Sequence, residues 1–142
     1  YRGLGESAVS INTPIATGEN IFSRIDTSNL LEYGGLRSNK DYLQMDIVLS
    51  YGLSEYIRII KDSEARGWSR KSLIPHAGHQ LALHAAAGLG LGGHEVASGE
   101  NGPFCGVSSD TDVEDGVAVL GTSPGIGIEK KPGLFKYFDG LI

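Results

Sequence analysis

Four ionisable residues stand at the ends of short apolar runs in the sequence. They are Glu19, Asp46, His76 and Glu95, and the intervals between them are 27, 30 and 19 residues. Intervals of this length are typical of units in which a strand is followed by a helix. A single charge at the end of a strand can simply lie at the solvated rim. Four in succession predict a ligand-binding or catalytic site, because the carboxyl ends of parallel strands are where such sites are built.

Histidine spacing offers a second kind of site. His76, His79 and His84 lie within nine residues and could in principle bind a transition metal. However, His79 and His84 are five residues apart, which turns their side chains away from each other on a helix, and the sequence has no HExxH motif. We therefore expect His84 to be a helix residue buried against the sheet. We expect His79 to be a helix cap or a residue lining a pocket.

Two further motifs are better explained by structure than by chemistry. The run Gly88–Gly93 matches GxGxxG, but it follows a predicted helix and precedes a predicted strand, the reverse of the dinucleotide-binding order. A tight turn is the simpler interpretation. Cys105 could be a nucleophile, yet no local signature supports this, and a loop residue is expected. A flavodoxin-like nucleotide domain would place phosphate after the first strand, where Glu19 would repel it.

The elements that would position these residues alternate along the chain. The expected strands and helices, in order, are 14–18, 26–33, 42–48, 54–66, 72–76, 80–89 and 93–96. Alternation of this kind predicts an α/β fold with a parallel sheet. In the first helix the expected N-caps lie within Asp26–Ser28. In the second, Ser54 is the expected N-cap, and the buried face is expected to hold Tyr56, Ile57, Ile60 and Ala65. Residues 112–119 are expected to form a hairpin or a loop.

Composition excludes several classes of protein. The chain has 142 residues and a net charge of −5, which argues against a nucleic-acid partner. No apolar run approaches the roughly 18 residues that a membrane span requires, so no membrane partner is expected. Cys105 is the only cysteine, which excludes a disulfide scaffold and favours a cytoplasmic location. The sequence begins at Tyr1, and we expect it to be part of a longer protein.

Several runs together resemble a known family. Residues 17–20, 44–46, 74–76 and 92–95 are similar to the C-terminal half of an enolase-superfamily barrel of the mandelate racemase subgroup. Within that subgroup, residues 16–20, 53–56, 75–80 and 85–93 resemble the D-tartrate dehydratases most. Residues 124–129 match the closing segment of the family.

The resemblance implies an architecture. Residues 1–142 would be the C-terminal half of a (β/α)8 TIM-like barrel, with about four βα units and a C-terminal tail. The N-terminal capping domain and the first half of the barrel would lie upstream. They would carry a lysine base and two more metal carboxylates. The complete protein would be a homo-oligomer, and the fragment alone would be inactive.

The resemblance also implies a reaction. Mg2+-dependent dehydration of a small-molecule acid sugar, D-tartrate or similar, would proceed by proton abstraction α to a carboxylate and an enediolate. Glu19 would bind the metal. Asp46 and His76 would form an acid–base pair, with His76 protonating the departing hydroxyl. Glu95 would hydrogen-bond the substrate carboxylate, and His79 would contact substrate beside His76 and Glu95.

Alternatives within the same resemblance stay open. A racemase or epimerase, or another sugar-acid dehydratase of the superfamily, would use similar residues. A barrel relative without catalytic activity is a further possibility. His94 stands where similar sequences carry a different polar residue, so the substrate is the least determined part of the expectation.

Overall fold

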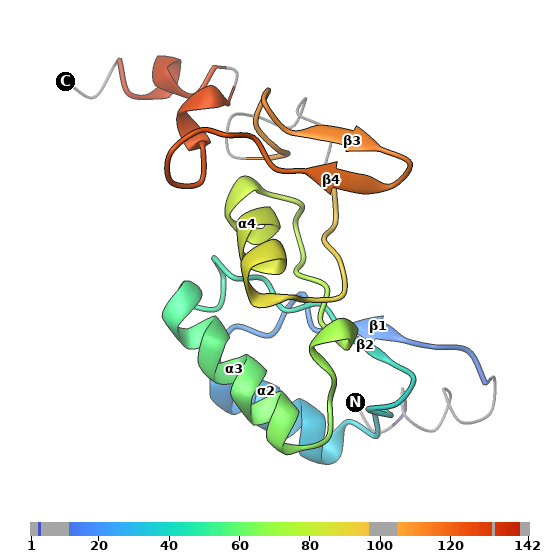
Figure 1. The fold of residues 1–142 in the computed structure, drawn as a ribbon. Helices are drawn as coiled ribbons and strands as arrows, with labels where there is room; N and C mark the ends of the chain where they lie inside the picture. The colour runs from blue at the N-terminus through green and yellow to red at the C-terminus, as the bar shows by residue number, and fades with distance from the viewer. Residues whose placement is uncertain (1–2, 4–11, 97–104, 132, 140–142) are drawn as a thin grey trace.

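The structure is a computed structural model that describes residues 3, 12–96, 105–131 and 133–139; the rest of the expected domain 1–142 lies outside the described residues. Helices and strands alternate in its first part, and a hairpin follows (Figure 1). The elements are β1 (Ala16–Thr17), α2 (Arg24–Tyr33), β2 (Tyr42–Leu43), α3 (Leu53–Ala65), α4 (Gln80–Leu89), β3 (Asp112–Glu114) and β4 (Val117–Val119). Short 3-10 turns occupy Arg70–Ser72, Ile128–Lys130 and Phe135–Tyr137.

An arc of parallel segments runs through the first part of the chain. β1 pairs with β2 in parallel, with Thr17 opposite Leu43. Leu43 in turn forms a parallel bridge with Leu73. The N–H of Gly92 then donates to the carbonyl of Leu73 at 3.0 Å. Four consecutive segments therefore lie side by side in sequence order, which is the arrangement of successive strands in a barrel wall.

The paired stretches are shorter than the sequence predicted. The strands expected at 14–18 and 42–48 are two residues long each. The strand expected at 72–76 contributes the bridge at Leu73 and the N–H of Ile74, which donates to the Leu43 carbonyl at 2.9 Å. The fourth segment pairs at Gly92, one residue before the strand expected at 93–96. Pro75 has no N–H to offer to a neighbouring segment. After Asp46 the chain turns, and the N–H of Ser50 donates to the Asp46 carbonyl at 3.0 Å. The Asp46 carbonyl is therefore hydrogen-bonded within its own turn, and Pro75 cannot extend the pairing of the third segment by an N–H.

Two expected helix starts were wrong. α2 begins one turn earlier than predicted, because Ser23 is its N-cap and accepts from the N–H of Asp26 at 3.1 Å. α3 has Gly52 at its N-cap without a side-chain cap, so Ser54 lies inside the helix. Since Ser, Thr and Asp all cap helices well, a cluster such as 23–28 does not indicate by itself which member is used.

α3 turns a slightly different face to the core than predicted. Its buried residues are Tyr56, Ile59, Ile60 and Ser63, a spacing of i, i+3, i+4 and i+7. Ile57 is only partly buried and Ala65 is exposed. The apolar stripe therefore follows helical periodicity, and Ser63 belongs to it because its hydroxyl donates to the Ile59 carbonyl at 2.9 Å.

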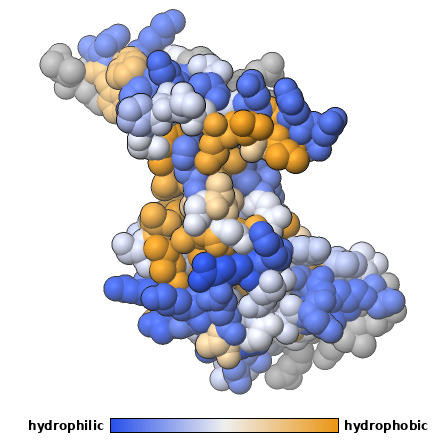
Figure 2. Space-filling view, in the orientation of Figure 1, coloured by the Kyte–Doolittle hydropathy of each residue, from blue (hydrophilic) through white to orange (hydrophobic). Residues whose placement is uncertain are grey.

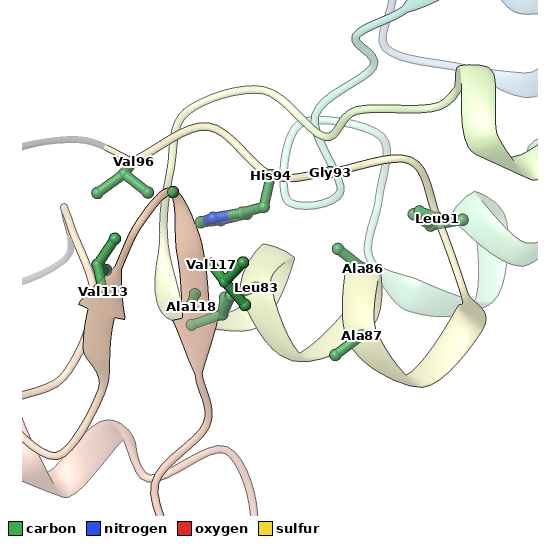
Figure 3. A pocket seen from close by; sticks show the side chains of 11 residues that line it. Leu83, Ala86, Ala87, Leu91, Gly93, His94, Val96, Val113, Val117 and Ala118 are labelled. Carbon is green, nitrogen blue, oxygen red and sulfur yellow. The ribbon is translucent and has the colours of Figure 1, made fainter.

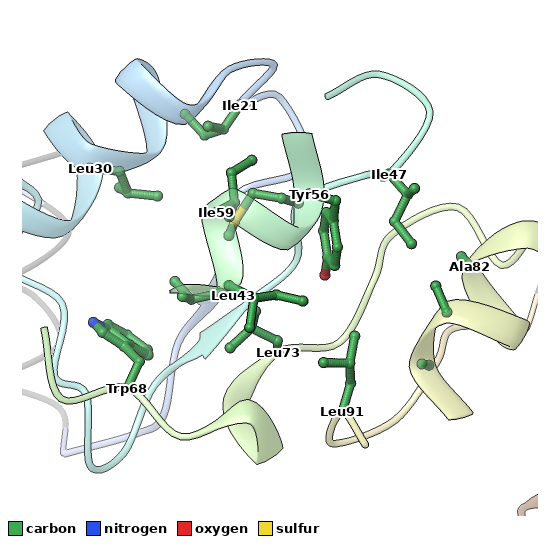
Figure 4. Close-up of a cluster of buried hydrophobic side chains, with 14 residues drawn as sticks. Ile21, Leu30, Leu43, Ile47, Tyr56, Ile59, Trp68, Leu73, Ala82 and Leu91 are labelled. Carbon is green, nitrogen blue, oxygen red and sulfur yellow. The ribbon is translucent and has the colours of Figure 1, made fainter. Parts of the chain in front are cut away.

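The hydrophobic core lies between the parallel segments and the helices that cover them (Figure 4). α2 and α3 lie side by side in Figure 1 and contribute Leu30, Tyr56 and Ile59. The strand segments contribute Leu43 and Leu73, which are fully buried. Complete burial of each such side chain stabilises the fold by about 1.5–3 kcal/mol. The remaining members are Ile21, Met45, Ile47, Ile60, Trp68, Ala82, Ala85, Ala86 and Leu91.

A buried ion pair holds the entrance to β1. The carboxylate of Asp41 accepts from the Arg37 guanidinium at 2.6 and 3.0 Å and from the N–H of Ile15 at 2.9 Å. Hydrogen bonds from Arg37 lower the pKa of Asp41 to about 2, against the opposing effect of burial. This contact ties the loop before β2 to the residue that precedes β1.

Residues 112–119 form a hairpin, one of the two alternatives predicted for them. β3 and β4 pair antiparallel, and the turn residues Asp115 and Gly116 have φ of 49° and 77°. Two positive φ values are typical of a type I′ turn. The hairpin lies on the opposite side of α4 from α2 and α3, which gives the molecule a narrow waist at α4 (Figures 1 and 2).

The close approach at Gly92 generates a stability prediction. A Cβ there would lie 1.9 Å from the Lys71 carbonyl oxygen. We expect Gly92→Ala to lower the free energy of unfolding by about 1–3 kcal/mol, because the backbone of the fourth segment must move. Urea denaturation measures this. Gly88→Ala is the matched control, since its Cβ meets nothing within 4 Å; it should raise stability by about 0.5–1 kcal/mol. Equal stabilities for the two variants would contradict the packing described.

Candidate active site

Asp46 is the buried centre of the site. It follows β2 at the start of a turn, and its side chain is 4% exposed. Its Oδ1 accepts from the N–H groups of Val48 at 2.7 Å and Leu49 at 3.0 Å. The local turn therefore supplies two donors to a carboxylate that has little contact with water.

Electrostatics keep Asp46 charged. Burial alone would raise the pKa of its carboxyl group, but contact with His79 and the hydrogen bonds from Leu49 and Val48 outweigh it and hold the pKa at about 2. Asp46 is therefore an anion at neutral pH. The same charge acts on Tyr56 beneath it: burial and the Asp46 carboxylate both raise the pKa of the phenol, whose oxygen is buried without a hydrogen-bond partner.

His76 lies between two carboxylates. Its Nδ1 is 3.5 Å from Asp46 Oδ2, and its Nε2 is 3.3 Å from Glu19 Oε2. The imidazole is 31% exposed and Glu19 is 56% exposed, so this side of the site is open. The structure thus brings together three of the four residues that the spacing singled out. A carboxylate on one ring nitrogen and an accessible second nitrogen form an arrangement suited to acid–base chemistry.

Glu95 joins the site through the backbone. Its Oε2 accepts from the N–H of Ala77 at 2.9 Å, and its Oε1 accepts from Gln44 Nε2 at 2.7 Å. Ala77 follows His76 directly and has a φ of 75°, a backbone conformation that residues other than glycine rarely adopt. The hydrogen bond that Glu95 accepts from Ala77 thus stabilises the turn that carries His76.

Gln44 is a site residue that the sequence reasoning did not name separately. It precedes Asp46 by two residues, and alternate residues of an extended segment point to the same face. That rule places the Gln44 amide beside the carboxylates, and it is the signal that could have found this residue.

His79 fills both of the roles considered for it. Its Nδ1 accepts from the N–H of Ala82 at 3.1 Å, so it is the N-cap of α4. Its Nε2 is 3.5 Å from Asp46 Oδ1, and its ring also lines a pocket. The expectation for His84 was wrong: its ring is only partly buried, and its Nε2 lies 3.1 Å from the amide nitrogen of Gln80.

An open pocket of about 500 Å3 adjoins the site. Its titratable lining residues are Asp46, His76 and His79. Aliphatic side chains form most of the remaining wall, which comprises Val48, Leu49, Ala77, Gln80, Leu81, Ile126 and Ile128. Ile126 and Ile128 come from the C-terminal tail, which is held there because the buried Gln80 side chain donates to the Ile126 carbonyl at 2.7 Å.

A second pocket, of about 260 Å3, lies between α4 and the hairpin (Figure 3). Its lining is aliphatic except for His94, whose Nε2 lies 3.1 Å from the His79 carbonyl. Burial lowers the pKa of His94, against the opposing contact with the His79 carbonyl. None of the described residues that line this pocket is a carboxylate, whereas Asp46, His76 and His79 line the pocket of about 500 Å3.

Metal-binding capacity within the described ranges is limited. Among residues 12–96, 105–131 and 133–139, no three His, Cys, Asp or Glu side chains gather closely enough to hold an ion. Glu19 is an exposed carboxylate beside His76 and supplies one hard oxygen donor. In the same part of the chain, no helix has the length and hydrophobicity needed to cross a membrane.

The low pKa of Asp46 predicts how stability depends on pH. Because the folded pKa of about 2 lies below the ordinary 3.8, the charge stabilises the fold above pH 4, and this contribution disappears as the pH falls from about 4 to 2. Asp46→Asn should lower the free energy of unfolding by about 2 kcal/mol at pH 7, and the difference should shrink below pH 4. Urea denaturation at pH 2–7 tests this.

Asp112→Asn, an exposed change in the hairpin, is the control and should stay within about 0.5 kcal/mol throughout. If the wild type still exceeds Asp46→Asn by the same free energy of unfolding at pH 2, the charge assigned to Asp46 is contradicted.

Comparison with solved structures places this arrangement in a known fold. An L-talarate dehydratase from Polaromonas sp. JS666, complexed with Mg and L-glucarate, is 24% identical with a TM-score of 0.73, covering 96% of this chain and 36% of that one. A mandelate racemase/muconate lactonizing enzyme from the same source is 24% identical with a TM-score of 0.74, covering 96% and 35%. An L-talarate/galactarate dehydratase from Salmonella typhimurium LT2 is 24% identical with a TM-score of 0.69, covering 89% and 30%.

These likenesses show the fold, an α/β portion of a (β/α)8 barrel, and the chain spans about a third of each of these structures. The sequence adds the family. Residues 1–133 match the family described as Enolase C-terminal domain-like, which is most of the chain. The chain therefore belongs to the enolase C-terminal domain-like family.

Proposed function

We propose that this chain forms part of a barrel enzyme that dehydrates an acid sugar by abstracting a proton α to a carboxylate. The observation that carries the proposal is the placement of His76, with its Nδ1 3.5 Å from Asp46 and its Nε2 3.3 Å from Glu19. Two of the similar structures are talarate dehydratases, which supports this reaction over others that the fold hosts.

The proposal includes the rest of a barrel. The chain spans about a third of the similar structures, so a first half of the barrel, a capping domain, a lysine base and two further metal carboxylates would come from preceding sequence. Exposed apolar side chains beside the site support this. Val48, Leu49 and Tyr51 are 56%, 48% and 80% exposed, and a larger protein would cover them.

Asp46 and His76 would handle the proton of the leaving group. The Asp46 anion lies 3.5 Å from Nδ1 of His76 and would stabilise a proton there, while Nε2 lies on the side of exposed Glu19. Protonated at Nε2, His76 would donate to the β-hydroxyl, which leaves as water after the α-proton has gone to the upstream base. The resulting enol becomes a 2-keto acid. The departing water carries the proton of His76, while the α-proton remains on the upstream base; release of that proton to solvent and uptake of one by His76 would restore both groups.

Glu19 fits one ligand position of a Mg2+ site. It is an oxygen donor at the end of β1, exposed and directed to the same space as His76 Nε2. Bound Mg2+ would supply a positive charge that stabilises the carboxylate of the substrate as the α-proton leaves. Glu95, when it carries a proton, would donate a hydrogen bond to the same carboxylate, from the place fixed by its contacts with Gln44 and Ala77.

D-Tartrate is the first substrate to test, because residues 75–80 and 85–93 resemble the D-tartrate dehydratases. L-Talarate and galactarate come next, since the similar dehydratases act on acids of that kind. Racemisation is the second candidate reaction, supported by the similar mandelate racemase/muconate lactonizing enzyme. Product analysis separates the two, because dehydration gives a 2-keto acid and racemisation gives an epimer.

His76→Asn should abolish dehydration in the protein that joins this chain to the rest of its barrel. We expect turnover to fall at least 100-fold, because Asn cannot transfer a proton, while Mg2+ binding measured by calorimetry stays within a few-fold. A 2-keto acid assay measures turnover. His84→Asn is the matched control, since His84 contacts Gln80 rather than the carboxylates, and it should retain activity. Turnover by His76→Asn at the wild-type rate would refute the assigned role.

A further inference from the structure

We infer that His79 is a positioning residue, which holds the Asp46 carboxylate so that its second oxygen faces His76. The inference rests on the proposed function and assigns His79 a role other than substrate binding. Its basis is geometric: one carboxylate lies 3.5 Å from each of two imidazoles, and the two rings contact different oxygens.

The backbone of α4 fixes the tautomer of His79. The N–H of Ala82 donates to His79 Nδ1 at 3.1 Å, so Nδ1 must present a lone pair and carries no proton. The ring proton therefore sits on Nε2, the nitrogen 3.5 Å from Asp46 Oδ1. His79 is thereby oriented as a donor toward Asp46.

Donors converge on one oxygen of Asp46. Oδ1 faces the N–H groups of Val48 and Leu49 and the Nε2–H of His79, whereas Oδ2 faces His76. The two turn N–H groups hold Oδ1 by hydrogen bonds, and His79 Nε2 approaches the same oxygen at 3.5 Å without forming a hydrogen bond. This electrostatic contact adds to the turn donors in limiting rotation of the carboxylate, whose Oδ2 lies 3.5 Å from His76 Nδ1. Loss of the His79 contact leaves donors from the turn only, so the carboxylate can rotate.

Exposure separates the two histidines. The side chain of His79 is 12% exposed, against 31% for His76. His79 is also held at its carbonyl, which lies 3.1 Å from His94 Nε2. The His79 side chain is therefore the more enclosed of the two, and His76 is the imidazole that is more accessible to a substrate.

Two substitutions separate capping from positioning. Asn at position 79 places its side-chain oxygen where Nδ1 lies, so it keeps the cap, but it is too short to reach Asp46. A glutamine side chain at position 79 is long enough to place an amide N–H where His79 Nε2 lies, but it no longer caps α4. In the active protein, we expect His79→Asn to melt only slightly below the wild type, because the cap is kept while Asp46 loses its contact with His79. It should lose about 10–100-fold in kcat at nearly unchanged KM. His79→Gln should melt at a lower temperature and recover most of kcat.

Nitrogen NMR of the imidazoles supplies a readout that needs no turnover. In the wild-type protein, Nδ1 of His79 should appear without a proton and Nε2 with one. Protonation at Nδ1 would overturn the inference, as would wild-type kcat in His79→Asn. A raised KM with unchanged kcat would identify His79 as a substrate ligand instead. If His76→Asn is inactive while His79→Asn is fully active, the positioning role fails and the proposed function stands. Absence of dehydratase activity in the wild-type protein would contradict the proposed function alone.

Discussion

The buried negative charge of Asp46 is the constraint around which the site is organised. A carboxylate that is 4% exposed is stable only when protein donors replace water. The donors at Val48 and Leu49 come from the turn that follows β2, and the imidazoles come from the segment that precedes α4. Satisfying one charge therefore joins two neighbouring segments of the barrel wall, and it also fixes the orientation of the imidazole that faces the opening.

The position of the site residues was predictable from the sequence, because each ends a strand-like segment and parallel segments bring such ends together. The contacts that hold Glu95 were not. The contact with Ala77 depends on a φ of 75° that no sequence pattern indicates. Alternation along the segment places Gln44 on the same face as Asp46, but it does not indicate that the Gln44 amide binds Glu95. The lengths of the strands were also predicted wrongly. Apolar residues at 72–76 indicate that a segment is buried, but its length as a strand depends on which backbone groups the neighbouring segment offers for hydrogen bonding. The packing of the tail over α4 left no signal in the apolar pattern.

The turn between His76 and His79 explains why two imidazoles can share one carboxylate. Ala77 and Gly78 both have positive φ, 75° and 59°, so the chain reverses sharply within two residues. Glycine adopts this conformation freely, but alanine does so at a cost of about 1–3 kcal/mol. Glu95 accepts the Ala77 N–H and offsets part of that cost. The carboxylate at the end of the fourth segment therefore supports the geometry of the third, whether or not it also contacts a substrate.

The start of α4 then connects this geometry to the rest of the chain. His79 caps the helix, and the next residue, Gln80, has a fully buried amide whose oxygen accepts from the Ser108 N–H at 2.7 Å. The amide nitrogen of Gln80 donates to the Ser108 hydroxyl at 3.0 Å and to the Ile126 carbonyl at 2.7 Å. A displacement of α4 would disturb the Asp46 contact and the tail together. The tail supplies Ile126 and Ile128 to the pocket beside His76, so the shape of the pocket and the orientation of the acid–base pair depend on the same helix terminus.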